Sequence, residues 1–460
     1  MGAKTMARRE ALALMAGAWG LSSSAEETAQ FRLGVFRCEV TPPLKHPLLA
    51  GLVKPAERVE EPLELRGFVL TGKEKPVVVA CIDWCEIRNG SYDAWRGAMA
   101  RAAGTEVSRV FFSSIHQHDA PLDDLDADRL VRAVHPADRI IDEKFHLRAV
   151  ESAVQGIAEA LRNAKPVTHV GTGSAKVEQV ASNRKTIGAD GKPSFGRMSA
   201  TADKTLRDRP EGTIDPRLRA LSFWNGETPL VVLNSYSVHP MSYYGQGGVS
   251  VDFVGLAREQ RQKAAPGVMQ IYGSGASGNT VAGKYNDGNQ ANRKVLAQRL
   301  ASAMQKAMQT TVRKPLRQVA FRQADLQLEA RDSARFTRAD LEKTLRESSN
   351  PRSRSLAALG LSWRNRVEKK HPITVPVADF SGAKLLLLPG ESYVEYQLFA
   401  QSLLPDEFVM TLGYGECGPG YIPTDQHFQE LDGNLNDWCW VNQGSEKKMQ
   451  AAIRQALLGP

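Results

Sequence analysis

Two histidines separated by a single residue are the first candidates for chemistry in this sequence. His116 and His118 follow the apolar run at 110–114, in a chain that has only nine histidines. Imidazoles at this spacing suit a metal site or acid–base catalysis, because the neutral ring binds zinc and its charge changes near neutral pH. A polar loop with both rings in solvent would give the same pattern. The pair alone does not decide between these readings.

Three more apolar runs end in side chains of similar kinds. The run PLVVLNSYSV ends at His239, KLLLLPG ends at Glu391, and EFVMTL leads into a glycine-rich turn with Tyr414, Glu416 and Tyr421. In open α/β sheets, sites form beyond the carboxyl ends of strands. Two histidines and a carboxylate there match the ligand set of a catalytic zinc. Taken alone, His239 is more often interpreted as a core histidine, so the metal hypothesis depends on all the runs converging.

These runs alternate with segments that have helical periodicity. Helical patterns occupy about 91–104, 142–164, 253–265 and 290–309. Strands alternating with helices of this length predict an α/β fold, with mixed central β-sheets flanked by helices. We see no internal repeat, and we interpret 29–460 as one large catalytic domain.

Two segments read as insertions in that domain, near 185–213 and 329–372. The first is rich in Gly, Pro, Ser and charge, and it has no period. Long irregular loops in compact domains are usually functional or mobile, so this one could serve as a lid. The second segment is charged and contains one helical pattern, ADLEKTLRES, and we expect it at the periphery.

The composition is that of a globular protein and not of a nucleic-acid binder. Hydrophobic residues make up 42% of the chain and charged residues 24%, and the net charge of +8 is spread along the sequence. A basic cluster without interleaved aromatics is interpreted as a solvated helical surface. Its members are Arg352, Arg354, Arg364, Arg366, Lys369 and Lys370.

The first residues have the layout of an export signal. Arg8 and Arg9 precede a short apolar stretch and then small residues. This predicts a twin-arginine-like signal at 1–28 and a periplasmic or secreted protein, with an ordinary first helix as the alternative. No run approaches the roughly 20 apolar residues that a membrane-spanning helix needs. The sequence does not exclude contact of the folded protein with a membrane surface.

The five cysteines do not form a disulfide framework. Cys81 and Cys85 lie in one strand-like run, where positions four apart are about 13 Å distant, so both are expected to be buried thiols. The sequence does not decide whether Cys417 and Cys439 form a disulfide.

Five segments, in order along the chain, carry a resemblance to a known family. They are RLGVFRCEVTPPLKHPLLAG, SSIHQHDAP, IDPRLRALSFWNGETPLVVLNSYSVHPMS, LLPGES and GYGECGPGYIPT. From about Phe31 onward, the chain resembles the catalytic domain of the neutral (non-lysosomal) ceramidases. The resemblance implies a zinc-dependent amidohydrolase. It also implies the zinc ligands His116, His239, Glu391 and Tyr421.

The resemblance also implies roles for two further residues. His118 would be an unmetallated neighbour that relays a proton to the leaving amine. Arg184, in ASNRK, would stabilise the oxyanion that develops at the substrate carbonyl. Zinc would polarise that carbonyl and lower the pKa of water to about 7.

Several positions depart from the family pattern. Asp119 and Ala120 replace a Ser-Gly pair, and we expect Asp119 to orient the His118 ring and raise its pKa. The run TDQHFQELDG lacks the family's second tyrosine, and Asn279 stands where an aspartate is usual. The family's C-terminal β-sandwich has no counterpart up to Pro460, so a preference for ceramide does not follow.

The sequence therefore predicts an exported Zn²⁺-dependent hydrolase that cleaves an amide (N-acyl) bond in a small-molecule or lipid substrate. Nucleic acid is not an expected partner. The alternative is a catalytically inactive relative that binds lipid or carbohydrate. A serine hydrolase centred on Ser277 is disfavoured, because GSGASG lacks the G-x-S-x-G spacing.

Overall fold

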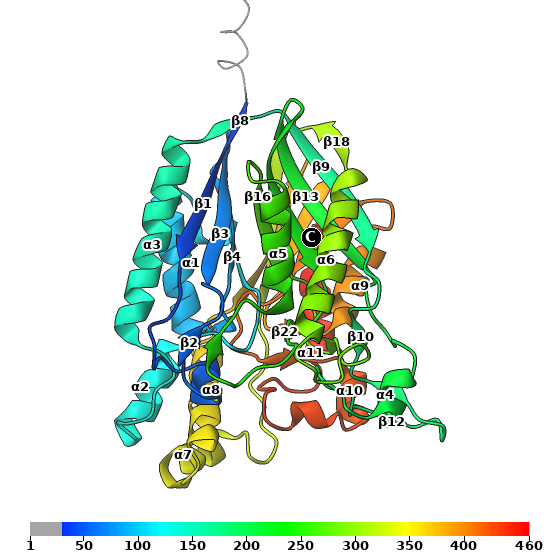
Figure 1. The fold of residues 1–460 in the computed structure, drawn as a ribbon. Coiled ribbons are helices and arrows are strands. Elements are labelled where there is room, and N and C mark those ends of the chain that lie inside the picture. The colour runs from blue at the N-terminus through cyan, green and yellow to red at the C-terminus, as the bar shows by residue number, and fades with distance from the viewer. Residues whose placement is uncertain (1–29, 460) are drawn as a thin grey trace, which may run out of the picture.

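Three mixed β-sheets form the interior of the molecule, and helices cover them (Figure 1). This architecture comes from a computed structural model that describes residues 30–459. The mixed α/β prediction is confirmed. The proposed export signal at 1–28 lies outside the described residues.

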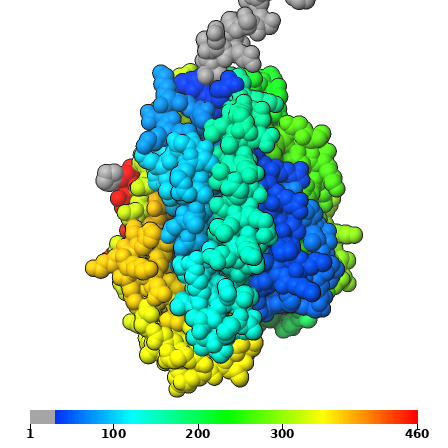
Figure 2. Space-filling view, turned by 90° about the vertical axis from the view of Figure 1, so that its left-hand side faces the viewer, coloured from blue at the N-terminus to red at the C-terminus, as the bar shows by residue number. Residues whose placement is uncertain are grey.

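The first sheet has the strand order β6-β4-β3-β1-β8. β3 and β4 form an antiparallel hairpin, and α1 crosses over to β6, which pairs with β4 in parallel. α3 covers β1 and lies beside α1, as Figure 2 shows. A Cβ atom at Gly34 would overlap the Ala160 carbonyl, so glycine permits this close approach. The elements are β1 (Phe31–Glu39), β3 (Glu64–Thr71), β4 (Val77–Ile82), α1 (Asn89–Ala103), β6 (Val110–Ser114), α3 (Glu143–Arg162) and β8 (Lys165–Val167).

The second sheet repeats this connectivity in the order β16-β14-β13-β9-β18. β13 and β14 form the hairpin, and α5 crosses over to the parallel strand β16. α6 covers β9 and β13. The elements are β9 (His169–Lys176), β13 (Arg217–Asn225), β14 (Thr228–Tyr236), α5 (Asp252–Ala264), β16 (Met269–Ser274), α6 (Asn292–Gln309) and β18 (Val312–Pro315).

The third sheet, β19-β20-β21-β23, follows the same plan again. β20 and β21 form the hairpin, α9 crosses over to the parallel strand β23, and α11 covers β19 and β20. The elements are β19 (Val319–Leu326), β20 (Ile373–Phe380), β21 (Ala383–Leu387), α9 (Val394–Ser402), β23 (Phe408–Leu412) and α11 (Ser445–Leu458). One connectivity is thus used three times, although the sequence shows no repeat.

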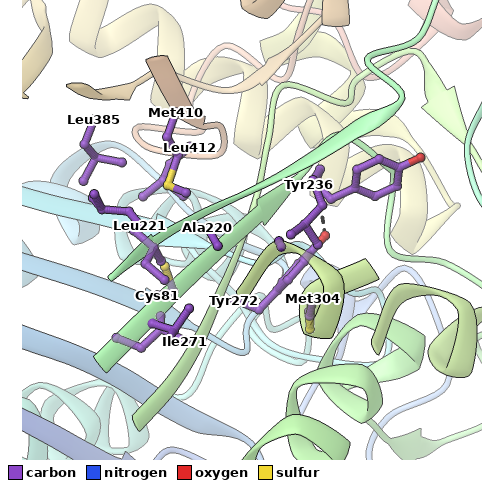
Figure 3. Close-up of a cluster of buried hydrophobic side chains, with 14 of the residues drawn as sticks. Cys81, Ala220, Leu221, Tyr236, Ile271, Tyr272, Met304, Leu385, Met410 and Leu412 are labelled. Carbon is purple, nitrogen blue, oxygen red and sulfur yellow. Dashed lines mark hydrogen bonds between the residues drawn. The ribbon is translucent and has the colours of Figure 1, made fainter. Parts of the chain in front are cut away.

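The three sheets meet around a shared apolar core. β6 contacts β16 and β21, and β23 contacts β14. The close-up in Figure 3 shows side chains from all three sheets together, including Cys81, Leu221, Ile271, Leu385 and Leu412. Each fully buried leucine there contributes about 1.5–3 kcal/mol to folding. This core holds the three sheets, and therefore their strand ends, in fixed relation.

The two segments interpreted as insertions occupy equivalent places. Each connects the first strand of its sheet to the hairpin: 185–213 lies between β9 and β13, and 329–372 lies between β19 and β20. The first contains β11 (Thr186–Ile187), β12 (Pro193–Ser194) and α4 (Lys204–Asp208). The second contains α7 (Arg338–Glu347) and α8 (Pro351–Glu368).

The expectation that 329–372 is peripheral is wrong for α8. The basic cluster is solvated only in part, because Arg352, Lys369 and Lys370 are exposed whereas Arg354 and Arg366 are buried. Most of this helix is buried, and α2 (Leu125–Val134) and α7 pack against it. Arg354 forms a bidentate pair with Asp138, and Arg366 pairs with Asp93. Asp138 and Asp93, which lie on distant segments, compensate the two arginine charges. The basic residues of α8 can therefore be buried.

Short two-stranded ladders and turns complete the fold, and β10 and β22 lie below the long strands in Figure 1. The ladders pair β2 (Arg58–Val59) with β15 (Gly248–Val249), β5 (Glu86–Ile87) with β7 (Leu122–Asp123), β10 (Ser182–Asn183) with β17 (Thr280–Val281), and β22 (Glu391–Ser392) with β24 (Tyr421–Ile422). The remaining elements are η1 (Leu49–Gly51), η2 (Val107–Arg109), α10 (Asp425–Gln429) and η3 (Gly433–Asn436).

Two further sequence expectations concern the cysteines and membrane-spanning helices. All five cysteines are buried free thiols, as expected for Cys81 and Cys85, and Cys417 and Cys439 are not bridged. Within 30–459, no helix combines the length and the apolar character needed to cross a membrane.

Candidate metal centre

The candidate ligands come from the strand ends of all three sheets. His116 follows β6, His239 follows β14, and Glu391 follows β21. His116 Nε2 lies 3.0 Å from His239 Nε2 and 3.1 Å from Glu391 Oε2, and His239 Nε2 lies 3.6 Å from the same oxygen. All three residues are buried. The structure therefore brings together a group that could hold a metal ion.

The ring orientations leave both Nε2 atoms available to a cation. His116 Nδ1 lies 2.9 Å from the Cys85 carbonyl oxygen, and His239 Nδ1 lies 3.2 Å from that of Ser277. A histidine that donates Nδ1–H to a carbonyl presents its Nε2 lone pair, as metal-binding histidines do. Two such lone pairs at 3.0 Å repel each other unless a positive charge lies between them.

Glu391 completes this donor set. Its Oε2 atom is buried, and it has no hydrogen-bond partner within residues 30–459. A buried carboxylate oxygen without a partner is costly, and a cation would compensate it. Burial opposes protonation of His116, but the Glu391 carboxylate outweighs that effect and raises the pKa of the ring, so Glu391 favours positive charge beside His116 Nε2. Two imidazole nitrogens and one carboxylate oxygen thus fit a metal ion.

Tyr414 supports His116 from one side. Its ring stacks on the His116 ring, with centroids 4.2 Å apart and an interplanar angle of 19°. Its hydroxyl lies 2.7 Å from Ser277 Oγ. Both stacked residues have left-handed backbone, with φ of 71° for His116 and 56° for Tyr414. Such strain in non-glycine residues persists where the surrounding structure enforces it, often at functional sites.

Tyr421 and Arg184 lie next to Glu391. β22 and β24 pair in parallel, with Glu391 opposite Tyr421. Arg184 Nη1 donates to the Tyr421 hydroxyl oxygen at 2.7 Å, and both side chains are buried. Burial alone would lower the pKa of Arg184, but Tyr421 and other neighbours raise it, so the guanidinium stays charged. The predicted fourth ligand and the predicted oxyanion group are therefore adjacent, while their roles stay predictions.

Asn279 helps to hold Arg184 in place. The Asn279 carbonyl accepts from the Arg184 backbone N–H at 2.8 Å. Its side chain donates to Glu395 Oε2 and accepts from the Val394 N–H. Asn279 thus links the start of β17 to the start of α9.

His118 lies close to the ligands. Its ring packs edge-on against His116 and His239, with centroids 5.1 and 5.5 Å away. Both of its ring nitrogens are buried without a hydrogen-bond partner among the described residues. Burial lowers the pKa of His118 well below its usual value, with His116 and Arg184 acting in the same direction. The ring is therefore neutral at neutral pH.

The expectation that Asp119 orients His118 and raises its pKa is wrong. Asp119 Oδ1 instead accepts from the Gly245 N–H at 2.7 Å. The carboxylate thus holds a neighbouring loop, and the pKa of His118 is lowered instead of raised. Asp119 is next to His118 in the sequence, but this adjacency did not reveal that the Asp119 side chain points to Gly245.

Sequence reasoning missed a buried acid–base pair behind the ligands. Glu86 Oε1 lies 3.8 Å from His116 Nδ1, and Arg88 Nη1 donates to Glu86 Oε2 at 2.9 Å. Burial raises the pKa of Glu86, although Arg88 opposes this. The sequence signal that could have indicated Glu86 was its position four residues after the end of the apolar run at 77–82.

Two other readings of the site are disfavoured by geometry. Cys85, His116 and His118 form a second group with metal-compatible spacing, but His116 Nδ1 already faces the Cys85 carbonyl. Burial also raises the pKa of the Cys85 thiol well above its usual value. Ser277 is not placed as a nucleophile, because its hydroxyl is bonded to Tyr414 and its carbonyl to His239.

Two solved structures share this fold. The neutral ceramidase of Pseudomonas aeruginosa superposes with a TM-score of 0.66 over 93% of this chain and 74% of its own, at 15% identity. A structure described as ceramidase complexed with C2 gives a TM-score of 0.67 over 93% and 75%, at 16% identity. No family model and no curated protein sequence matches the chain. The predicted likeness to neutral ceramidases is confirmed at the level of the fold.

Proposed function

We propose that the chain is a zinc-dependent hydrolase that cleaves an amide (N-acyl) bond. One observation carries this proposal: two Nε2 atoms and a carboxylate oxygen meet within 3.0–3.6 Å in a buried site, and that oxygen has no hydrogen-bond partner in the described part of the chain. A set of two histidines and one acid is typical of catalytic zinc. Tyr421 is proposed as the fourth protein ligand, which its register opposite Glu391 supports.

The chain's own residues supply the remaining parts of the reaction. A bound zinc ion provides Lewis-acid polarisation of the carbonyl and activation of water. Arg184 donates its N–H groups to the oxygen on which negative charge develops. His118 is neutral and close to the ligands, so it can accept a proton and deliver it to the leaving nitrogen. Neither ring nitrogen has a hydrogen-bond partner within residues 30–459, so both are free for this exchange.

The substrate class is proposed from the fold relatives. One of the solved relatives is described as a complex with C2, and the other is a neutral ceramidase. This supports an N-acyl substrate, either a lipid or a small molecule, with membrane-surface contact for a lipid. We also propose that the protein is exported to the periplasm or secreted, on the basis of Arg8 and Arg9 and the apolar stretch after them. Cell fractionation of the full chain tests this, and retention in the cytoplasm would contradict it.

A turnover assay tests the hydrolase proposal against the inactive-binder alternative. The protein is offered N-acetylsphingosine, a long-chain N-acylsphingosine and short N-acyl amino acids, and release of the free amine is measured. We expect release from at least one class, loss of activity on chelation, and recovery with zinc. Binding of a probe without release from any class would favour the inactive lipid- or carbohydrate-binding alternative.

A further inference from the structure

Two consecutive tyrosines in the loop between β14 and α5 have different surroundings. The Arg293 guanidinium lies 3.6 Å from the centre of the Tyr243 ring and also donates to the Tyr243 carbonyl. Tyr244 faces the metal centre instead. Its ring packs edge-on against His118 with centroids 4.8 Å apart, and 42% of the residue is exposed. Tyr244 is therefore positioned both to cover His118 and to meet solvent.

The loop that carries Tyr244 is attached to the residue that follows His118. Asp119 Oδ1 accepts from the Gly245 N–H at 2.7 Å, and the Asp119 carbonyl accepts from the Ser250 N–H at 3.1 Å. Both ends of the turn at 245–250 are thus bonded to one residue. Asp119 is 5% exposed, so water competes little for these bonds. The segment that presents His118 also fixes the ring that covers it.

Glycines allow the turn to take this path. Gly245 and Gly247 have φ of 85° and 76°, a region that side chains other than glycine rarely adopt. The next residues form the β15 ladder with β2. Tyr244 therefore sits just before a constrained turn.

The Tyr244 phenol can act as a hydrogen-bond donor. Burial of the ring raises its pKa, although the positive charge of Arg184 opposes this, so the hydroxyl stays protonated at neutral pH. His118 is the group proposed to deliver a proton to the leaving nitrogen. A donor next to it would meet substrate on the leaving-amine side.

We propose that Tyr244 is a substrate-contacting residue that covers His118 and donates a hydrogen bond to the leaving-amine side of an N-acyl substrate, and that Asp119 is its positioning residue. The proposed contact rests on the proposed hydrolase function. The cover over His118 does not, because it depends only on the loop and its anchor.

Chemical modification of His118 tests the cover without turnover. The protein is treated with diethylpyrocarbonate with and without zinc, and carbethoxylation of His118 is followed by mass spectrometry, with the exposed His371 as internal reference. We expect Tyr244→Ala to raise the rate several-fold and Tyr244→Phe, which keeps the ring, to leave it unchanged. Asp119→Ala should raise the rate, and Asp119→Asn, which keeps an acceptor oxygen, should restore it. An unchanged rate in Tyr244→Ala overturns the cover.

Turnover of N-acetylsphingosine tests the contact. We expect Tyr244→Phe to lower kcat/KM about tenfold through the loss of one hydrogen bond, with the zinc content unchanged. Tyr243→Phe is the matched control and should behave as the wild type. Equal kcat/KM in Tyr244→Phe and the wild type overturns the contact. A wild type that releases no amine from any N-acyl probe overturns the proposed function and with it the contact, while the His118 result still decides the cover.

Discussion

The strand-end ligands and the loop residues around them are held in different ways. His116, His239 and Glu391 each follow a buried strand, and each strand belongs to a different sheet. His118 and Tyr244 lie on connecting segments, where single side-chain bonds such as Asp119 to Gly245 fix the geometry. The candidate metal centre thus belongs to the framework, whereas the residues proposed to meet substrate belong to the loops. Under the proposed function, changes in these loops would alter substrate preference and leave the metal-compatible group in place.

Glu391→Gln is expected to have the largest effect. The substitution keeps size but removes the negative charge beside the two Nε2 atoms, at 3.1 and 3.6 Å. We expect metal affinity to fall by more than about 100-fold and amine release to be lost, because a ligand is affected directly. Titration with zinc and the turnover assay measure both. Glu86→Gln, behind His116, should fall short of this effect. Equal affinity of Glu391→Gln and the wild type would show that Glu391 is no ligand.

Arg88→Met tests the framework side of the comparison. Arg88 and Glu86 are both fully buried, with Nη1 and Oε2 2.9 Å apart. Removing the guanidinium leaves Glu86 uncompensated, which typically costs about 3–5 kcal/mol of unfolding free energy. Urea unfolding measures the change. The control is Arg129→Met, whose partner Asp126 is exposed, and it should change stability by less than about 1 kcal/mol. Similar losses in the two variants would contradict this ranking.

Arg184→Ala tests the substrate side. The guanidinium donates to the Tyr421 hydroxyl, and it has no lone pair to offer a cation. We expect kcat to fall about 10²–10³-fold, as for the loss of an oxyanion donor, with metal content retained. Steady-state kinetics and elemental analysis of the same sample provide the two readings. Undiminished kcat in this variant would remove Arg184 from the reaction.

Asp119 should give the smallest effect, visible as a pH dependence. Burial raises the pKa of Asp119 to about 6 from 3.8, although Gly245 and Arg293 oppose this. The folded state therefore binds this proton more tightly, and the stability it contributes is lost as pH rises from about 4 to above 6. Relative to Asp119→Asn, the wild type should lose up to about 3 kcal/mol of unfolding free energy across this range. Urea unfolding at several pH values measures the difference, and a flat difference contradicts it.

The sequence predicted the fold class and the strand-end residues because both leave local signals. Apolar runs that end in His116, His239 or Glu391 can be read without knowing which strands pair. The use of one connectivity in all three sheets could not be predicted from the sequence. Strands that pair are distant in the chain, and the three sheets share no sequence pattern. Burial of Arg354 on α8 depends on Asp138, 216 positions away. Tyr244 is one aromatic residue in a glycine-rich loop, and its position depends on Asp119.

The metal content of the purified protein decides whether His116, His239 and Glu391 form a metal site. Protein purified without added metal is analysed for zinc and other metals, alongside His239→Ala, which removes one of the two opposed Nε2 atoms. We expect about one zinc per chain in the wild type and less than about a tenth of that in the variant. A wild type without bound metal, or a stoichiometric metal that survives His239→Ala, would contradict it.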